Sequence, residues 1–97
     1  MTSSYKRIEA VKVAIRILRL LADQKDPVNG NEVARALDLP HGTVMCHLST
    51  LEDERLVRSV GGAWEMDMGL ALFWARHKAT LAGRIARDTD NLQRLEE

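Results

Sequence analysis

Small polar side chains concentrate between residues 41 and 50, and their types suit contact with a nucleic acid. Thr43 and Ser49 can exchange hydrogen bonds with phosphate oxygens or base edges, and His41 can reach a phosphate or a guanine. Met45 can contact a thymine methyl group, and Gly42 lets another backbone approach closely. The candidate contact residues in this stretch are His41, Gly42, Thr43, Met45, Cys46, Ser49 and Thr50.

The same side chains do not form a catalytic pattern. No serine or cysteine is spaced with a histidine and a group that would orient it, and there is no Gly-rich phosphate loop. We therefore predict no enzyme activity, no catalytic residue and no cofactor. A metal site is a less favoured alternative, because Cys46 and His47 are neighbours on one predicted helix and point about 100° apart. All the His and Cys residues of the chain are His41, Cys46, His47 and His77.

Two short helices joined by a turn are predicted to position these residues. Asn29 can cap the first helix, and Glu32, three residues later, can bond back to it. Pro40 ends that helix because it disfavours helical geometry in the residue before it. The second helix, predicted over residues 41–54, places Val44, Leu48 and Leu51 on one face at spacings of four and three. This arrangement is a helix-turn-helix.

A β-hairpin is predicted directly after the second helix. Two short β-prone runs, residues 57–60 and 63–66, flank the pair Gly61-Gly62, which is a hairpin signal. Trp64 in the second run is predicted to cover the core. A helix-turn-helix followed by a small hairpin has the order of a winged helix. The predicted fold class is therefore mainly α with a small β-hairpin wing.

The stretch from about residue 11 to residue 72 resembles the DNA-binding domain of IclR-type transcriptional regulators. The resemblance rests on residues 28–37 with their Glu-Val-Ala, on Asp-Leu-Pro at residues 38–40 followed by Thr43, and on Leu-Ser-Thr-Leu-Glu at residues 48–52. Trp-Glu-Met at residues 64–66 stands where the family usually has Tyr-Arg-Leu. The resemblance implies sequence-specific binding of double-stranded DNA, with the helix over residues 41–54 in the major groove.

The chain departs from the family at the start of this recognition helix. Many members have Lys-Ser-Thr there and an Arg further along the outer face, whereas this chain has His-Gly-Thr at residues 41–43 and Cys46. The wing tip lacks Lys and Arg, and the formal net charge is zero. Phosphate contacts are therefore expected from basic residues outside the motif and from one residue of the wing. These residues are Lys6, Arg7, Lys12, Arg16, Arg19 and Arg58.

Two further helices are predicted outside the motif. Residues 5–24 carry an apolar face so wide that more than one neighbour is needed to cover it. Residues 68–97 contain no proline and many good helix formers, so we divide the chain into a winged helix-turn-helix domain (1–67) and a C-terminal helix (68–97). Lys78 and Asp88 interrupt a heptad-like apolar series in this helix. The series predicts oligomerisation through Trp74, Leu81, Ile85, Leu92 and Leu95.

The predicted protein is a stand-alone regulator that acts as a homodimer or higher oligomer. The expected role is that of a phage-type repressor or a transposition regulator, and no small-molecule effector is expected. The single cysteine fits the cytoplasm, and the apolar run at residues 11–22 is too short and too charged to span a membrane. Two alternatives stay open. In the first, the long helix folds back on its own domain, with a break near Gly83; in the second, the winged helix is a protein-interaction module that does not bind DNA.

Overall fold

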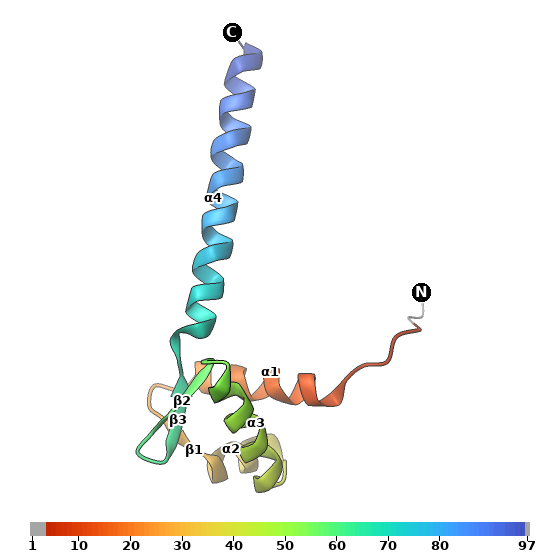
Figure 1. Cartoon of the computed structure of the whole chain (residues 1–97), viewed down its shortest axis with the longest axis vertical. Coiled ribbons are helices and arrows are strands. Elements are labelled where there is room, and N and C mark those ends of the chain that lie inside the picture. Colours follow the sequence, from red (N-terminus) through yellow and green to blue (C-terminus); the bar gives the residue numbers. More distant parts are fainter. Residues whose placement is uncertain (1–3, 97) are drawn as a thin grey trace.

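Four helices and three short strands follow one another along residues 4–96, the part of the chain that the computed structural model describes (Figure 1). The predicted fold class is confirmed: the molecule is mainly α, with a small wing and a long C-terminal helix. In chain order the elements are α1 (Glu9–Ala22), β1 (Val28–Asn29), α2 (Gly30–Leu37), α3 (His41–Asp53), β2 (Val57–Val60), β3 (Ala63–Met66) and α4 (Met68–Glu96).

The helix α1 is shorter than the predicted helix over residues 5–24. Ile8 is its N-cap, with an extended backbone and no side-chain cap. An earlier start would gain little, because Tyr5 and Ile8 are 82% and 65% exposed and therefore bury little apolar surface there. Lys6 and Arg7 would also place positive charge at the positive end of the helix dipole. These two basic residues therefore precede α1 in irregular chain.

Only part of the apolar face of α1 is covered by its own domain. Val13, Ile17 and Leu21 are buried in the core, whereas Val11 and Ile15 remain 57% and 41% exposed. The core itself lies between the three short helices and the inner face of the wing. Its buried side chains are Val13, Ile17, Leu18, Leu21, Val28, Val33, Ala34, Val44, Leu48, Leu51, Val57 and Trp64. The prediction that Trp64 covers the core is confirmed.

The turn between α2 and α3 follows from local bonding at both ends of α2. The Asn29 side chain accepts a 2.9 Å hydrogen bond from the Glu32 backbone N–H, and its amide donates to the Glu32 carboxylate at 3.0 Å. At the other end Asp38 adopts a left-handed conformation (φ 54°, ψ 52°), and the Leu39 N–H bonds to the Ala34 carbonyl at 2.9 Å. This closing turn redirects the chain into α3 without a glycine. The predicted cap at Asn29 is confirmed.

The wing is a three-stranded antiparallel sheet in the order β1-β3-β2. The predicted hairpin is confirmed, and both turn glycines have positive φ, 58° at Gly61 and 82° at Gly62, as a tight two-residue hairpin turn requires. The additional strand β1 was not predicted. It pairs Val28 with Trp64, and a two-residue strand followed at once by a helix has too little periodicity to be recognised from sequence.

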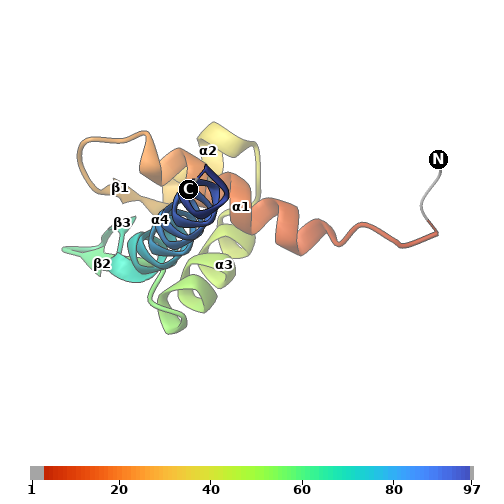
Figure 2. The same ribbon diagram turned by 90° about the horizontal axis from the view of Figure 1, so that it is seen from above.

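The helix α4 leaves the domain as one unbroken element and projects away from it (Figures 1 and 2). It neither breaks at Gly83 nor folds back, so the fold-back alternative is not the arrangement of this structure. Because of α4 the Cα radius of gyration is 19.2 Å, against about 12.5 Å for a compact chain of this length. None of the helices within residues 4–96 combines the length and apolar character needed to cross a membrane.

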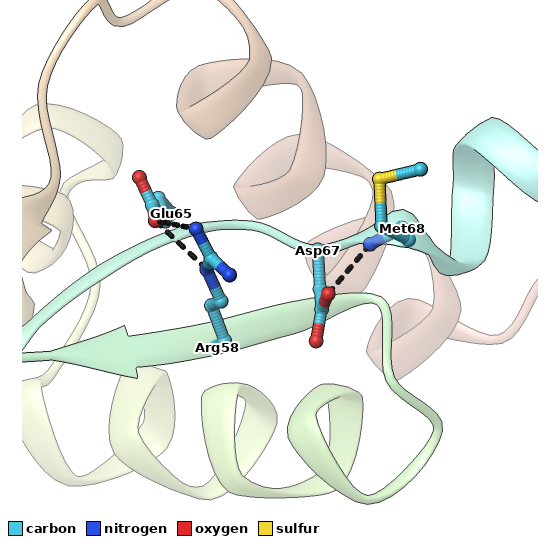
Figure 3. Close-up of polar contacts among 4 residues, drawn as sticks. All are labelled: Arg58, Glu65, Asp67 and Met68. Atoms are coloured by element: carbon cyan, nitrogen blue, oxygen red, sulfur yellow. Dashed lines mark hydrogen bonds and ion pairs between the residues drawn. The ribbon is translucent and has the colours of Figure 1, made fainter.

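The root of α4 is fixed to the turn that follows α3. Arg55 adopts a left-handed conformation there (φ 61°), and its carbonyl accepts a 3.0 Å hydrogen bond from the Gly69 N–H. A Cβ at Gly69 would lie 2.5 Å from the same carbonyl oxygen, so this close approach requires glycine. The Asp67 carboxylate accepts a 2.7 Å bond from the Met68 N–H (Figure 3). The first turn of α4 is therefore anchored, although the rest of the helix is exposed.

Candidate nucleic-acid interface

The two faces of α3 have opposite environments. Val44 and Leu48 are completely buried and Leu51 is 8% exposed, so this face holds the helix on the core. The opposite face presents Gly42, Cys46, Ser49 and Asp53, all of which are exposed. Thr43 and Thr50 are exposed on one flank of this outer face. The core contacts thus fix the outward direction of the candidate contact residues.

The start of α3 offers backbone donors. Pro40 is the N-cap, and no side chain caps the first turn. The first intrahelical bond joins the Val44 N–H to the Pro40 carbonyl at 3.1 Å, so the N–H groups of residues 41–43 have no partner within the helix. A Cβ at Gly42 would meet no atom within 4 Å, so the fold itself does not require glycine there. Such a helix start favours an anion such as phosphate.

One flank of α3 packs against the first residue of α2. A Cβ at Gly30 would lie 2.6 Å from the Met45 sulfur and 3.4 Å from the His41 Nε2 atom. Met45 is half-buried against the core as a result, whereas His41 stays exposed. The structure therefore places Met45 on the flank of α3 that packs against α2, where it is less accessible than the exposed Thr43 and Ser49. This close contact depends on the absence of a Cβ at Gly30, and the spacing of apolar residues along the chain does not predict it.

The other flank of α3 faces α1. The His47 ring lies between two carbonyl oxygens, with Nδ1 2.8 Å from that of Thr43 and Nε2 3.2 Å from that of Ala10. This half-buried histidine therefore connects α3 to α1. The Thr50 hydroxyl donates to the Cys46 carbonyl at 2.8 Å. Thr50 and Cys46 also line an apolar groove of about 450 Å³ between α1 and α3, so the outer face of α3 continues into this groove on the side of α1.

Two of the three basic residues of α1, Arg16 and Lys12, already have partners within the chain, whereas Arg19 is exposed. The Arg16 guanidinium donates to the Leu37 carbonyl at 3.1 Å, and so caps the C-terminal end of α2. The Lys12 ammonium lies 3.9 Å from the Glu9 carboxylate, an exposed pair that is worth little energy. Ahead of the helix, Arg7 donates to the Tyr5 carbonyl at 3.0 Å. These residues are exposed and can contact phosphate, but Arg16 would have to share its donors.

The single basic residue predicted on the wing is paired with an acid. The Arg58 Nε and Nη2 atoms lie 2.8 Å and 2.7 Å from the Glu65 Oε1 atom, across the paired strands β2 and β3 (Figure 3). Arg58 and Glu65 are symmetrically placed about Gly61-Gly62, so a two-residue hairpin loop makes them direct neighbours. The equal spacing of Arg58 and Glu65 from Gly61-Gly62 is the sequence signal for this ion pair. The ion pair leaves the wing with little free positive charge.

No group of three or more His, Cys, Asp or Glu side chains within residues 4–96 gathers closely enough to hold a metal ion. His77, which the metal alternative included, lies on α4, while His41, Cys46 and His47 lie on α3. Adjacent residues of one helix point in different directions, and this geometry separates Cys46 from His47.

Comparison with known proteins agrees with this geometry. Residues 10–61 match the model of the IclR helix-turn-helix domain. An IclR family transcriptional regulator from Brucella abortus superposes with a TM-score of 0.65 at 25% sequence identity. The repressor BlcR of Agrobacterium tumefaciens superposes with a TM-score of 0.62 at 30% identity. Each match covers 72% of this chain and 28% of the other, so this chain spans little more than a quarter of the length of these regulators.

A third structure shows the fold alone. MepR, a transcription regulator of the Staphylococcus aureus multidrug efflux pump MepA, superposes with a TM-score of 0.52 at 18% identity, over 88% of this chain and 71% of MepR. No curated protein matches the chain.

Proposed function

Because the chain belongs to the family of IclR helix-turn-helix domains, we propose that it binds double-stranded DNA in a sequence-specific manner, as an oligomer, with α3 in the major groove. The family is one of DNA-binding domains of transcriptional regulators and not of enzymes. A regulatory role in the cytoplasm, where the DNA is, follows from this proposal. Since BlcR is a repressor, repression is the first direction of regulation to test.

The observation that carries the proposal is the orientation of α3. Its apolar face is held in the core by Val44, Leu48 and Leu51, and its opposite face is exposed along the whole helix. Thr43 and Ser49 on that side are short hydrogen-bonding residues that can reach base edges or phosphate. The unpartnered N–H groups at residues 41–43 add donors for a phosphate. We therefore place the helix start closest to the DNA backbone.

Few positive charges support this surface, and this limits the expected affinity of one domain. The formal net charge is zero, and Arg58, Arg16 and Lys12 are already engaged within the chain. Each phosphate contact strengthens binding at low salt and steepens the salt dependence. A domain with few such contacts gains from assembly, because two linked domains bind two half-sites together.

Assembly is proposed to occur through α4. The five side chains predicted for oligomerisation are 40–84% exposed in the single chain, and no described element of the domain covers them. A long helix with large apolar residues exposed is expected to associate, because association removes these residues from water. Replacing Leu81 and Ile85 by glutamate should prevent this. Sedimentation analysis would show a lighter species, and an unchanged mass would contradict assembly through this face.

The test of DNA binding is a fluorescence-anisotropy titration with the DNA upstream of the protein's own coding sequence and with a scrambled duplex, at low and near-physiological salt. The proposal expects a preference for the upstream DNA that survives the higher salt. The double variant T43A/S49A should lose this preference and keep its thermal stability, because both side chains lie outside the core. Unchanged affinity of the variant would refute the assigned contact face.

A protein-interaction module is the second candidate, and one observation favours it. The ion pair between Arg58 and Glu65 neutralises the wing, and three acids, Glu52, Asp53 and the C-cap Glu54, lie at the C-terminal end of α3. Such a surface suits a protein partner better than a polyanion. Equal binding of both duplexes that disappears as salt is raised would favour this candidate over the regulator.

A further inference from the structure

The exposed apolar residues of α4 form a regular seam. Trp74, Leu81, Ile85, Leu92 and Leu95 are 65%, 40%, 67%, 58% and 84% exposed. With Lys78 and Asp88 included, the seam advances by alternate steps of four and three residues from 74 to 95, which is the spacing of the two core positions of a heptad. A seam of this kind is covered by another helix with the same spacing, and a second copy of α4 supplies one.

The two charged residues decide which way the second copy must run. In a parallel pair each core residue faces its own equivalent, so Lys78 would face Lys78 and Asp88 would face Asp88 at the seam. In an antiparallel pair the first core position of the heptad faces the second. Lys78 of one copy then faces Asp88 of the other, and this happens twice because the pair is symmetric. The two interruptions of the apolar seam thereby become two ion pairs.

The same register satisfies the apolar positions. In an antiparallel pair the numbers of any two facing residues have a constant sum, because the two helices run in opposite directions. The pair Lys78 and Asp88 therefore fixes which residues face each other along the whole seam. Leu81 then faces Ile85 and Trp74 faces Leu92, while Leu95, at the end of the seam, faces the small apolar residue Ala71. The two-fold axis crosses the pair at the level of residue 83. All of these facing residues lie on the same face of α4, so the helix needs no change of conformation to form these contacts.

We propose that two copies of this chain associate through an antiparallel pair of α4 helices, in the register that sets Lys78 against Asp88. The inference deepens the proposed function and rests on its claim that α4 mediates assembly. The charge distribution along α4 supports it. Residues 76–87 carry only basic charges, whereas Asp88, Asp90 and Glu96 make the end of the helix predominantly acidic. In this register Arg76 and Lys78 of one copy lie level with Asp90 and Asp88 of the other, while Arg84 and Arg87 lie near the two-fold axis.

The residues that flank the seam are compatible with a close pair. On one flank Ala75, Ala82 and Thr89 are small, so two backbones can approach there. On the other flank Arg84 would lie near its own equivalent close to the two-fold axis. This repulsion is weak, because Arg84 is exposed and its long side chain can point into water. The intrahelical ion pair between Asp90 and Arg94, at 3.1 Å, lies outside the seam and is not disturbed.

The arrangement fixes how far apart the two DNA-binding domains lie. The domain is attached at Met68, fifteen positions before the two-fold level, so the two attachment points are separated by about 45 Å along the helix pair at a rise of 1.5 Å per residue. The domains are then at opposite ends of the pair. The two α3 helices would contact separate half-sites and would not lie side by side.

Disulfide cross-linking tests the direction of the pair. Cys46 is first replaced by serine, which leaves no native thiol. W74C alone should not cross-link, because its two copies would lie about 27 Å apart along the antiparallel pair. W74C combined with L92C should form a covalent dimer, because residues 74 and 92 face each other. A covalent dimer formed as readily by W74C alone would show a parallel pair and overturn the inference.

Charge exchange tests the register independently. K78D should weaken the dimer by about tenfold or more, because it replaces two ion pairs by two repulsive contacts. D88K should act alike, and the double variant K78D/D88K should regain the affinity of the original protein. Failure of the double variant to recover, with its helix content intact by circular dichroism, would overturn the register.

DNA titration of the same samples separates the inference from the proposed function. Antiparallel cross-linking without any preference for the upstream DNA would refute the regulator and leave the pair established. Specific DNA binding by a parallel or monomeric protein would refute the pair and leave the regulator standing.

Discussion

Replacing Gly42 by alanine separates the stability of α3 from its proposed contact with DNA. The residue lies in the first turn of α3, and a Cβ there would meet no atom within 4 Å. Alanine therefore costs no packing energy in the free protein. Since glycine is the poorer helix former by about 0.5–1 kcal/mol, G42A should stabilise the domain by up to that amount. This corresponds to a rise in melting temperature of roughly 2–8 °C for a domain of this size.

DNA affinity should change in the opposite direction. The added methyl group points away from the protein and toward the proposed DNA surface, where it would hold the N–H groups of residues 41–43 away from a phosphate. A hydrogen bond to a charged group contributes about 1.5–3 kcal/mol, so losing one weakens binding roughly ten- to a hundredfold. The assay pairs thermal denaturation by circular dichroism with anisotropy titration against the upstream DNA.

The matched control is G83A. Gly83 also has open space around its Cβ position, but it lies on α4 and far along the chain from α3. Like G42A, G83A should stabilise its helix, here α4. It should leave the DNA affinity of the assembled protein unchanged. If G42A binds DNA as tightly as the unmodified protein, the proposed close approach of a DNA phosphate to the start of α3 is wrong. If G42A lowers the melting temperature, the helical geometry assigned to this turn is wrong.

Two further substitutions test the wing and the root of α4. E65Q should release Arg58 for a phosphate, so DNA affinity should rise a few-fold at low salt and its salt dependence should steepen by about one counterion. The control R58Q should lower DNA affinity. Equal affinities for the two variants would exclude Arg58 as a contact. G69A should lower the melting temperature by an amount equivalent to about 1–3 kcal/mol, because its Cβ would lie 2.5 Å from the Arg55 carbonyl oxygen. A melting temperature equal to that of the unmodified protein would show that the root of α4 is not anchored at this contact.

The position of the polar residues on α3 has a consequence for specificity. A recognition surface of short, mostly uncharged side chains carries few bidentate contacts of the kind that arginine makes with guanine. Discrimination would then depend on hydroxyl and backbone contacts and on the spacing of two half-sites. The spacing is set by α4 if the antiparallel pair exists, so the long helix would contribute to sequence selection without touching a base.

Much of the fold could be predicted because it depends on neighbours in the sequence. Asn29 caps α2 through residues three positions away, and Gly61-Gly62 sets the hairpin through its own backbone. Val44 and Leu48 are buried because helical spacing places them on one face. These interactions need only a few residues of chain, and the sequence displays all of those residues side by side.

The length of α1 and the position of Met45 could not be predicted in this way. The helix α1 begins at Glu9 because Tyr5 and Ile8, just before it, bury little apolar surface, and a sequence does not show which surfaces are present to cover them. Met45 is half-buried because Gly30, on another helix, leaves a space that its sulfur fills. Both outcomes depend on where separate elements meet, which is decided when the whole domain packs.

By itself, the sequence determined the order of the four helices and the hairpin, the cap at Asn29, the hairpin turn, the buried face of α3 and the apolar seam of α4, because each is a local pattern of polarity and backbone preference. Only the tertiary structure decided that Arg16 caps α2 through the Leu37 carbonyl and that β1 completes the sheet by pairing Val28 with Trp64. These contacts join residues more than twenty positions apart. Their energy depends on distances that exist only after the chain has folded, and no spacing along the chain encodes them.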